Sequence, residues 1–91
     1  MAVEVRLPTV LRSHAGGASA VTVDGATVGE VLSKLVAEHP GMAGQVLTDD
    51  GKLHKFVNVY VDDDDVRYLQ GLDTPVKDGA EVSILPAVAG G

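Results

Sequence analysis

Apolar and charged residues alternate at the start of the chain. Residues 3–7 read Val-Glu-Val-Arg-Leu and are followed by Pro8. Successive side chains of an extended chain point to opposite faces, so this pattern predicts a strand that buries its two valines and its leucine. A weaker alternation over residues 18–23 predicts a second strand. Residues 9–17 between them, which end in a glycine pair, are expected to form a loop.

A helical repeat follows, and it is the clearest pattern in the chain. Thr27 and Glu30 fit a capping box at its start, and Pro40 and Gly41 end it. Apolar residues recur at the spacing of one helix face, namely Val28, Val31, Leu32, Leu35 and Val36. We therefore predict one main helix, with His39 as the residue at its C-terminal cap.

Two further strands are predicted in the second half of the chain. The valines of residues 56–61 share one face, and Val82 and Ile84 share one face of residues 81–85. One helix can cover only one face of a sheet built from these strands. We expect a small mixed sheet in an α+β roll, with the first and last strands side by side in its centre.

Shorter segments connect these elements. We expect a helical turn within residues 42–47 and tight turns at 48–51 and 62–65. Residues 66–68 are expected to be a brief extended piece. The predicted order is therefore strand, strand, helix and then three strands.

Composition restricts the classes of protein to consider. The 91 residues suffice for one small domain, and 45% of them are hydrophobic, as in a globular protein. The lack of cysteine excludes a disulfide framework, a thiolate metal site and a cysteine nucleophile. The net charge is −6 and the basic residues are scattered, so a nucleic-acid partner is not expected. Because neither a signal peptide nor a membrane span is recognisable, we expect a cytoplasmic protein with no membrane partner.

Side chains that could carry chemistry are not arranged for catalysis. Residues 62–65 are four consecutive aspartates, but they lack the spaced ligands and the mid-loop glycine of a calcium loop, so no metal is expected there. His14, His39 and His54 do not have zinc-ligand spacing. No serine lies in a nucleophile elbow. The sequence therefore does not indicate an enzyme.

The final six residues, 86–91, have a different character. They read Pro-Ala-Val-Ala-Gly-Gly, carry no side-chain charge and have no side chain larger than valine. Such a slim tail can enter a narrow channel in another protein, where its α-carboxylate is the only reactive group. A frayed terminus without function is the alternative, because chain ends are often disordered.

Apolar residues also face away from the predicted helix. Phe56 and Tyr60 on one strand, with Leu85 and Ala87 on the last strand or just after it, fall on the uncovered face of the sheet. An exposed apolar patch often marks an interaction surface. The alternative is that loops at residues 9–17 or 69–76 cover some of these side chains.

Taken together, these motifs resemble the ubiquitin-like β-grasp sulfur carriers. The family includes the small subunit of molybdopterin synthase, the thiamine-biosynthesis carrier and the cysteine-biosynthesis carrier of actinobacteria. The resemblance spans the whole chain, and the cysteine-biosynthesis carrier is the type that the chain resembles most. It rests on the N-terminal strand, Thr27-Val28-x-Glu30, His39-Pro40, Phe56-Val57-Asn58-Val59, Asp78-Gly79 and the ending Leu85 to Gly91.

The resemblance implies a function for the tail. A partner enzyme of the E1-like adenylating class would use ATP to adenylate the carboxylate of Gly91, and a sulfur donor would convert it to a thiocarboxylate. The implied sulfur acceptor is a biosynthetic enzyme, either a PLP-dependent cysteine synthase or another thiolating synthase, and a zinc peptidase would then release cysteine. The carrier itself binds no cofactor.

The resemblance also assigns roles to residues. Residues 1–86 would form the β-grasp domain and residues 87–91 a flexible tail. Gly91 is expected to react, and Phe56, Tyr60 and Leu85 to dock partners. The slim segment that precedes the reacting residue consists of Ala87, Val88, Ala89 and Gly90.

Three other functions stay open. The chain could be the small subunit of a stable molybdopterin synthase, a ubiquitin-like modifier of lysines, or a plain β-grasp interaction domain. Ubiquitin has arginine just before its Gly-Gly, whereas this chain has Ala89 there, which makes protein conjugation the less favoured use.

Overall fold

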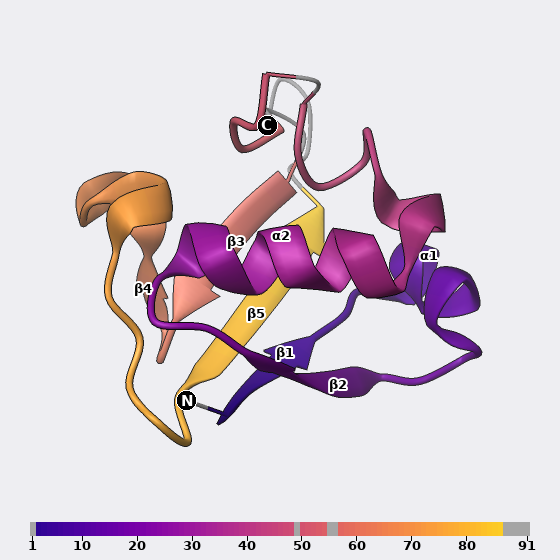
Figure 1. The fold of residues 1–91 in the computed structure, drawn as a ribbon, viewed down its shortest axis with the longest axis horizontal. Coiled ribbons are helices and arrows are strands. Elements are labelled where there is room, and N and C mark those ends of the chain that lie inside the picture. The colour runs from indigo at the N-terminus through magenta and orange to yellow at the C-terminus, as the bar shows by residue number, and fades with distance from the viewer. Residues whose placement is uncertain (1, 49, 55–56, 87–91) are drawn as a thin grey trace.

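The computed structural model describes residues 2–48, 50–54 and 57–86, and it contains one mixed sheet. The strands are β1 (Ala2–Arg6), β2 (Ala20–Asp24), β3 (Val57–Val61), β4 (Asp64–Asp65) and β5 (Glu81–Pro86). They are arranged in the order β2-β1-β5-β3-β4 (Figure 1). β1 and β5 are parallel neighbours in the centre, and the other neighbours are antiparallel. The predicted adjacency of the first and last strands is confirmed.

The main helix, α2 (Val28–Glu38), lies across one face of this sheet (Figure 1). Thr27 is its N-cap, and the Thr27 Oγ1 accepts a hydrogen bond from the Glu30 N–H at 3.3 Å. The Glu30 carboxylate accepts from the Thr27 hydroxyl at 3.5 Å, where a full capping box would use the Thr27 backbone N–H. His39 is the C-cap residue, as predicted.

The core lies between α2 and the covered face of the sheet. β1, β3 and β5 contribute alternate residues to it, β2 contributes Val23, and the helix contributes its apolar stripe. Full burial of one such valine or leucine side chain contributes about 1.5–3 kcal/mol to folding. The buried residues with no or almost no exposed area include Val3, Val5, Val28, Val31, Leu32, Leu35, Val59, Val82 and Ile84.

The connection between β1 and β2 differs from the predicted loop. It contains a one-turn helix, α1 (Thr9–Arg12), followed by a 3₁₀ turn, η1 (Ser13–Ala15), and β2 begins at Ala20 instead of residue 18. Leu11 is buried in the core, so tertiary packing stabilises a helix that is too short to leave a periodic pattern.

Residues 66–68 are also not extended, contrary to the prediction. They form a 3₁₀ helix, η3 (Val66–Tyr68), because the Asp65 carboxylate accepts a hydrogen bond from the Arg67 N–H at 2.9 Å and caps its start. The fourth strand is instead β4, at Asp64–Asp65. A further 3₁₀ turn, η4 (Gly71–Asp73), leads toward β5.

Smaller differences concern the segment after α2. The helical turn expected within residues 42–47 is a 3₁₀ turn, η2 (Pro40–Met42), that starts two residues earlier and buries Met42. The turn at 48–51 is confirmed by the hydrogen bond from the Gly51 N–H to the Thr48 carbonyl at 2.9 Å. No helix in the described ranges is both long enough and apolar enough to cross a membrane.

Candidate functional site: the open sheet face and the end of β5

The face of the sheet opposite α2 carries the candidate site. Tyr60 on β3 is half-buried there, and Leu85 on β5 is 47% exposed. In the antiparallel register, Tyr60 faces Ser83 and Asn58 faces Leu85, so Tyr60 and Leu85 are diagonal neighbours on one face. The structure therefore brings these two predicted docking residues together. Phe56, Ala87, Val88, Ala89, Gly90 and Gly91, the other predicted site residues, lie outside the described residues.

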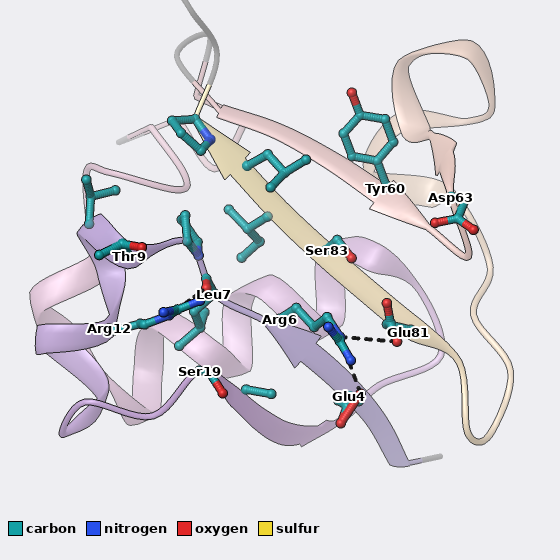
Figure 2. A pocket seen from close by; sticks show the side chains of 16 residues that line it. Glu4, Arg6, Leu7, Thr9, Arg12, Ser19, Tyr60, Asp63, Glu81 and Ser83 are labelled. Carbon is teal, nitrogen blue, oxygen red and sulfur yellow. Dashed lines mark hydrogen bonds and ion pairs between the residues drawn. The ribbon is translucent and has the colours of Figure 1, made fainter.

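This face is hollowed into a depression of about 860 Å³ (Figure 2). β1, β3 and β5 provide half of its lining residues, and the segment from Pro8 to Arg12 borders it. The residues of that segment flank Leu85 without covering it, which excludes the alternative that the connection at residues 9–17 buries this leucine.

The two ends of the depression differ in polarity. Leu85, Pro86 and Val10 give apolar surface at the end where β5 finishes, and Tyr60 lies nearer the middle of β5, facing Ser83. Charged side chains gather where β5 begins, on β1, on β5 and on the turn after β3 (Figure 2). They are Glu4, Arg6, Asp63 and Glu81.

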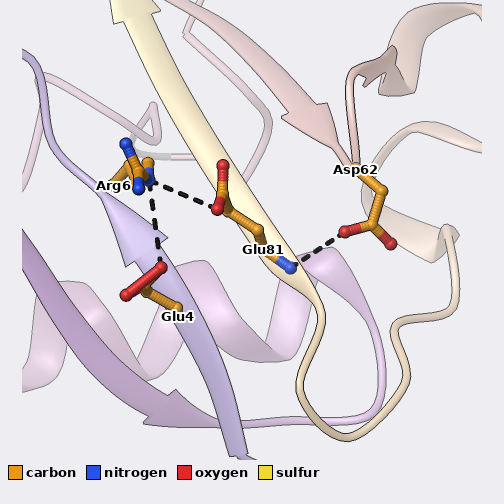
Figure 3. A network of polar contacts seen from close by, with 4 residues as sticks. All are labelled: Glu4, Arg6, Asp62 and Glu81. Carbon is orange, nitrogen blue, oxygen red and sulfur yellow. Dashed lines mark hydrogen bonds and ion pairs between the residues drawn. The ribbon is translucent and has the colours of Figure 1, made fainter.

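Arg6 connects two carboxylates at the charged end (Figure 3). Its Nε lies 3.3 Å from Glu81 Oε2 and 3.8 Å from Glu4 Oε2. The three side chains are between 40% and 62% exposed, so each pair contributes at most about 1 kcal/mol. Sequence reasoning missed this group, because Glu81 meets Arg6 only through the parallel pairing of β1 with β5.

The aspartates of residues 62–65 have structural roles. Asp62 and Asp63 form the turn between β3 and β4 with φ of 49° and 77°, Asp65 caps η3, and Asp64 pairs with Val61. Among the residues that the structure describes, no three His, Cys, Asp or Glu side chains are grouped so that they could hold a metal ion.

Pro86 is the last residue of β5 and the last described residue before the C-terminal segment. It faces Val57 in the register. The Asp62 N–H donates to the Glu81 carbonyl at 3.0 Å, and hydrogen-bonded pairs alternate along an antiparallel ladder, so Val57 and Pro86 are a non-hydrogen-bonded pair. A strand tolerates proline at such a position, because the missing N–H would point away from β3.

A second, smaller pocket of about 270 Å³ lies on another side of Pro86. Its lining is mainly apolar and includes Pro8, Leu11, His54 and Val57. The end of β5 is therefore flanked by two depressions that share Pro8, Val10 and Pro86 in their linings.

Comparisons with known proteins agree with this architecture. The model of the ThiS family matches residues 5–91. The sulfur carrier protein CysO of Mycobacterium tuberculosis H37Rv is 50% identical over 93 residues, which cover 100% of both chains. The crystal structure of the Amycolatopsis orientalis BexX/CysO complex contains a chain of 48% identity that matches with a TM-score of 0.88, covering 98% of this chain and 99% of that one.

A modifier protein is also similar. Small archaeal modifier protein 3 of Haloferax volcanii is 46% identical over 68 residues, covering 75% of this chain and 73% of that protein. The family model spans nearly the whole chain. The solved Amycolatopsis orientalis structure matches the fold of this chain over 98% of its length. The chain therefore belongs to the ThiS family and has the ubiquitin-like β-grasp fold.

Proposed function

We propose that this protein is a sulfur carrier, a cosubstrate that other enzymes act on. The observation that carries the proposal is its 50% identity over the full chain to a protein named as a sulfur carrier. The slim Pro86 to Gly91 ending, which falls within the family match at residues 5–91, gives the carrier a terminal carboxylate to load. This chemistry consumes ATP, so the proposal places the protein in the cytoplasm.

Loading needs two steps. In the first, a carboxylate oxygen of Gly91 attacks the α-phosphorus of ATP on an E1-like adenylating enzyme, and pyrophosphate leaves. In the second, a sulfur nucleophile attacks the acyl carbon and AMP leaves, so one oxygen of Gly91 is replaced by sulfur. The adenylate is needed because an ionised carboxylate has no good leaving group. The chain's part is to present a tail narrow enough to reach the bound nucleotide.

The open sheet face is proposed as the surface on which the adenylating enzyme docks. Tyr60 and Leu85 lie on it, and its apolar end is continuous with Pro86, where the tail begins. Phe56 belongs to the proposed surface on the strand pattern alone. The solved BexX/CysO complex supports the view that a carrier of this type assembles with a protein partner.

Cysteine is the proposed final product. The thiocarboxylate would add to an aminoacrylate held by a PLP-dependent cysteine synthase, and a zinc peptidase would release cysteine from the tail. The chain is 50% identical to CysO and 36% identical to a putative sulfur carrier of Archaeoglobus fulgidus. This higher identity to CysO favours a cysteine synthase as the sulfur acceptor.

Intact-mass measurement tests the loading step. The protein is incubated with ATP, sulfide and the adenylating enzyme from its own host, and a variant that lacks Gly91 serves as the control. We expect a mass gain equal to the difference between one sulfur and one oxygen atom, in the full chain only. No gain with any adenylating enzyme of the host would overturn the sulfur-carrier function.

A protein modifier is the second candidate, favoured by the similarity to small archaeal modifier protein 3. Conjugates of higher mass on a blot of host extract, dependent on Gly90 and Gly91, would support it. A partner that stays bound through gel filtration would instead favour the small subunit of a molybdopterin synthase.

A further inference from the structure

Arg67 makes two hydrogen bonds to β3 from outside the sheet. Its Nη1 donates to Asn58 Oδ1 at 2.9 Å, and its Nη2 donates to the Val57 carbonyl at 3.0 Å. Its own N–H donates to Asp65 Oδ1, which holds the start of η3. The planar guanidinium thus joins η3 to two consecutive residues of β3 through two separate nitrogens.

These contacts lie where β3 has, among the described residues, no neighbouring strand on its outer side. β4 pairs only with Tyr60 and Val61, so the ladder stops short of Val57 and Asn58. The Val57 N–H donates to the His54 carbonyl at 3.2 Å, and its carbonyl accepts from Arg67. Both backbone groups of Val57 are therefore satisfied without a strand.

The same two residues of β3 hold the end of β5. Val57 faces Pro86, and Asn58 faces Leu85. By the alternation derived from the Asp62–Glu81 bond, Asn58 and Leu85 form a hydrogen-bonded pair, and this is the pair of that kind nearest the C-terminus within the described residues. Strand ends fray, so the stability of this pair determines how firmly Pro86 is held.

We propose that Arg67 is a positioning residue for the C-terminal tail. It fixes the end of β3, β3 fixes Leu85 and Pro86, and Pro86 sets the direction in which the tail leaves the protein. This inference rests on the proposed carrier function, in which the terminal carboxylate must reach a nucleotide inside another enzyme. A loosely held base spreads the tail over more orientations and lowers the fraction that can react.

Arginine suits this role better than lysine. The two acceptors, a backbone carbonyl and a side-chain amide oxygen, need two donors in one plane, which a guanidinium provides. A lysine ammonium keeps the charge, but its three N–H donors sit on one nitrogen and are not held in a plane. Arg67→Lys therefore separates the hydrogen-bond geometry from the charge.

The first test measures backbone amide hydrogen exchange in the carrier alone. We expect Arg67→Ala to speed exchange at Asn58 and Leu85 about tenfold, since a lost charge-assisted hydrogen bond changes a local opening equilibrium by this order. The exchange rates in Arg67→Lys should approach those in Arg67→Ala. Asn58→Ala keeps the Val57 acceptor, so its exchange rates should fall between those of the original protein and those of Arg67→Ala. Lys77→Ala is the control: it also removes one positive charge, but it lies before the start of β5, so exchange at both amides should be unchanged. Unchanged exchange at Leu85 in both Arg67 variants would overturn the inference.

The second test measures loading of the same variants by the adenylating enzyme. The kcat/KM for thiocarboxylate formation should fall roughly three- to tenfold in Arg67→Ala and Arg67→Lys, mainly through kcat, because the tail base is disordered after docking. Lys77→Ala should load like the original protein. A rise in KM alone, with normal exchange at Leu85, would mean that Arg67 contacts the enzyme directly and would overturn the positioning role. Failure of the unmodified protein to load refutes the carrier function itself, whereas normal loading of both Arg67 variants refutes only this inference.

Discussion

Asp62 and Glu81 are joined by two hydrogen bonds. The Asp62 N–H donates to the Glu81 carbonyl at 3.0 Å, and the Glu81 N–H donates to Asp62 Oδ1 at 3.1 Å. The second of these bonds, drawn in Figure 3, uses the side chain of a residue whose φ is 49°. The turn after β3 is thereby fixed to the first residue of β5, the strand that leads to the tail.

Two substitutions of Asp62 should separate the contribution of its hydrogen bond to stability from that of its charge. We expect Asp62→Ala to lower the free energy of unfolding by about 1–3 kcal/mol, because it removes the acceptor and puts alanine in a left-handed conformation. Asp62→Asn keeps an oxygen acceptor and tolerates this φ, so it should stay within about 0.5 kcal/mol of the original protein. Urea unfolding measures both. An asparagine variant as unstable as the alanine variant would show that the carboxylate charge matters more than the bond.

The neighbouring Asp63 should limit stability. Its φ is 77°, and no side-chain hydrogen bond to it is found within the described part of the chain. Asp63→Gly creates the Asp-Gly pair that hairpin turns with two positive φ values favour, and we expect it to raise the free energy of unfolding by about 0.5–1 kcal/mol. The midpoint of urea unfolding should rise with an unchanged slope. A lower midpoint would mean that the aspartate is not strained in this turn.

Gly25, which directly follows β2, is a glycine that close packing requires. A Cβ at residue 25 would lie 2.9 Å from the Val31 backbone nitrogen and 2.7 Å from Val31 Cγ2. We expect Gly25→Ala to destabilise the protein by about 1–3 kcal/mol in thermal unfolding, because α2 would have to shift.

Gly29 serves as a comparison for Gly25, because a Cβ there would make less severe contacts. A Cβ there would lie 3.1 Å from the Leu72 carbonyl oxygen, which is tight, while alanine within the helix gains about 1 kcal/mol over glycine. The two effects should nearly cancel in Gly29→Ala. If Gly25→Ala and Gly29→Ala unfold at the same temperature, the close approach of α2 to residue 25 is not what selects glycine there.

Most of the layered fold could be predicted from the sequence, because its elements bury regular patterns. The stripe that includes Val28, Leu32 and Leu35 predicted α2, and the valines of β3 predicted its buried face. Segments without a repeat could not be predicted. α1 depends on the burial of Leu11. η3 depends on a single cap from Asp65, and for this reason residues 66–68 are helical and not extended as predicted.

The candidate site was predictable only in its apolar part. Tyr60 and Leu85 follow from strand alternation once α2 is assigned to one face. The contacts of Arg6 with Glu81 and of Arg67 with Val57 depend on strand register and on the path of the chain after β4. No local pattern encodes either of these, so sequence reasoning could not find the charged end of the depression or the residue that holds the end of β3.

Leu85 and Leu69 allow a direct test of the proposed docking face. They are exposed to nearly the same extent, 47% and 46%, but Leu85 lines the depression on the open sheet face, whereas Leu69 follows η3 and does not line it. We expect Leu85→Ala to raise the KM for loading by about tenfold, because an apolar side chain at the centre of an interface typically contributes 1–2 kcal/mol or more to binding. Leu69→Ala should leave the KM unchanged, and both variants should keep their unfolding temperatures within a few degrees. Because exposure and chemistry are matched, a difference between them can only come from position. Equal loading of the two variants would place the docking surface elsewhere and leave the open face without a role in recognition.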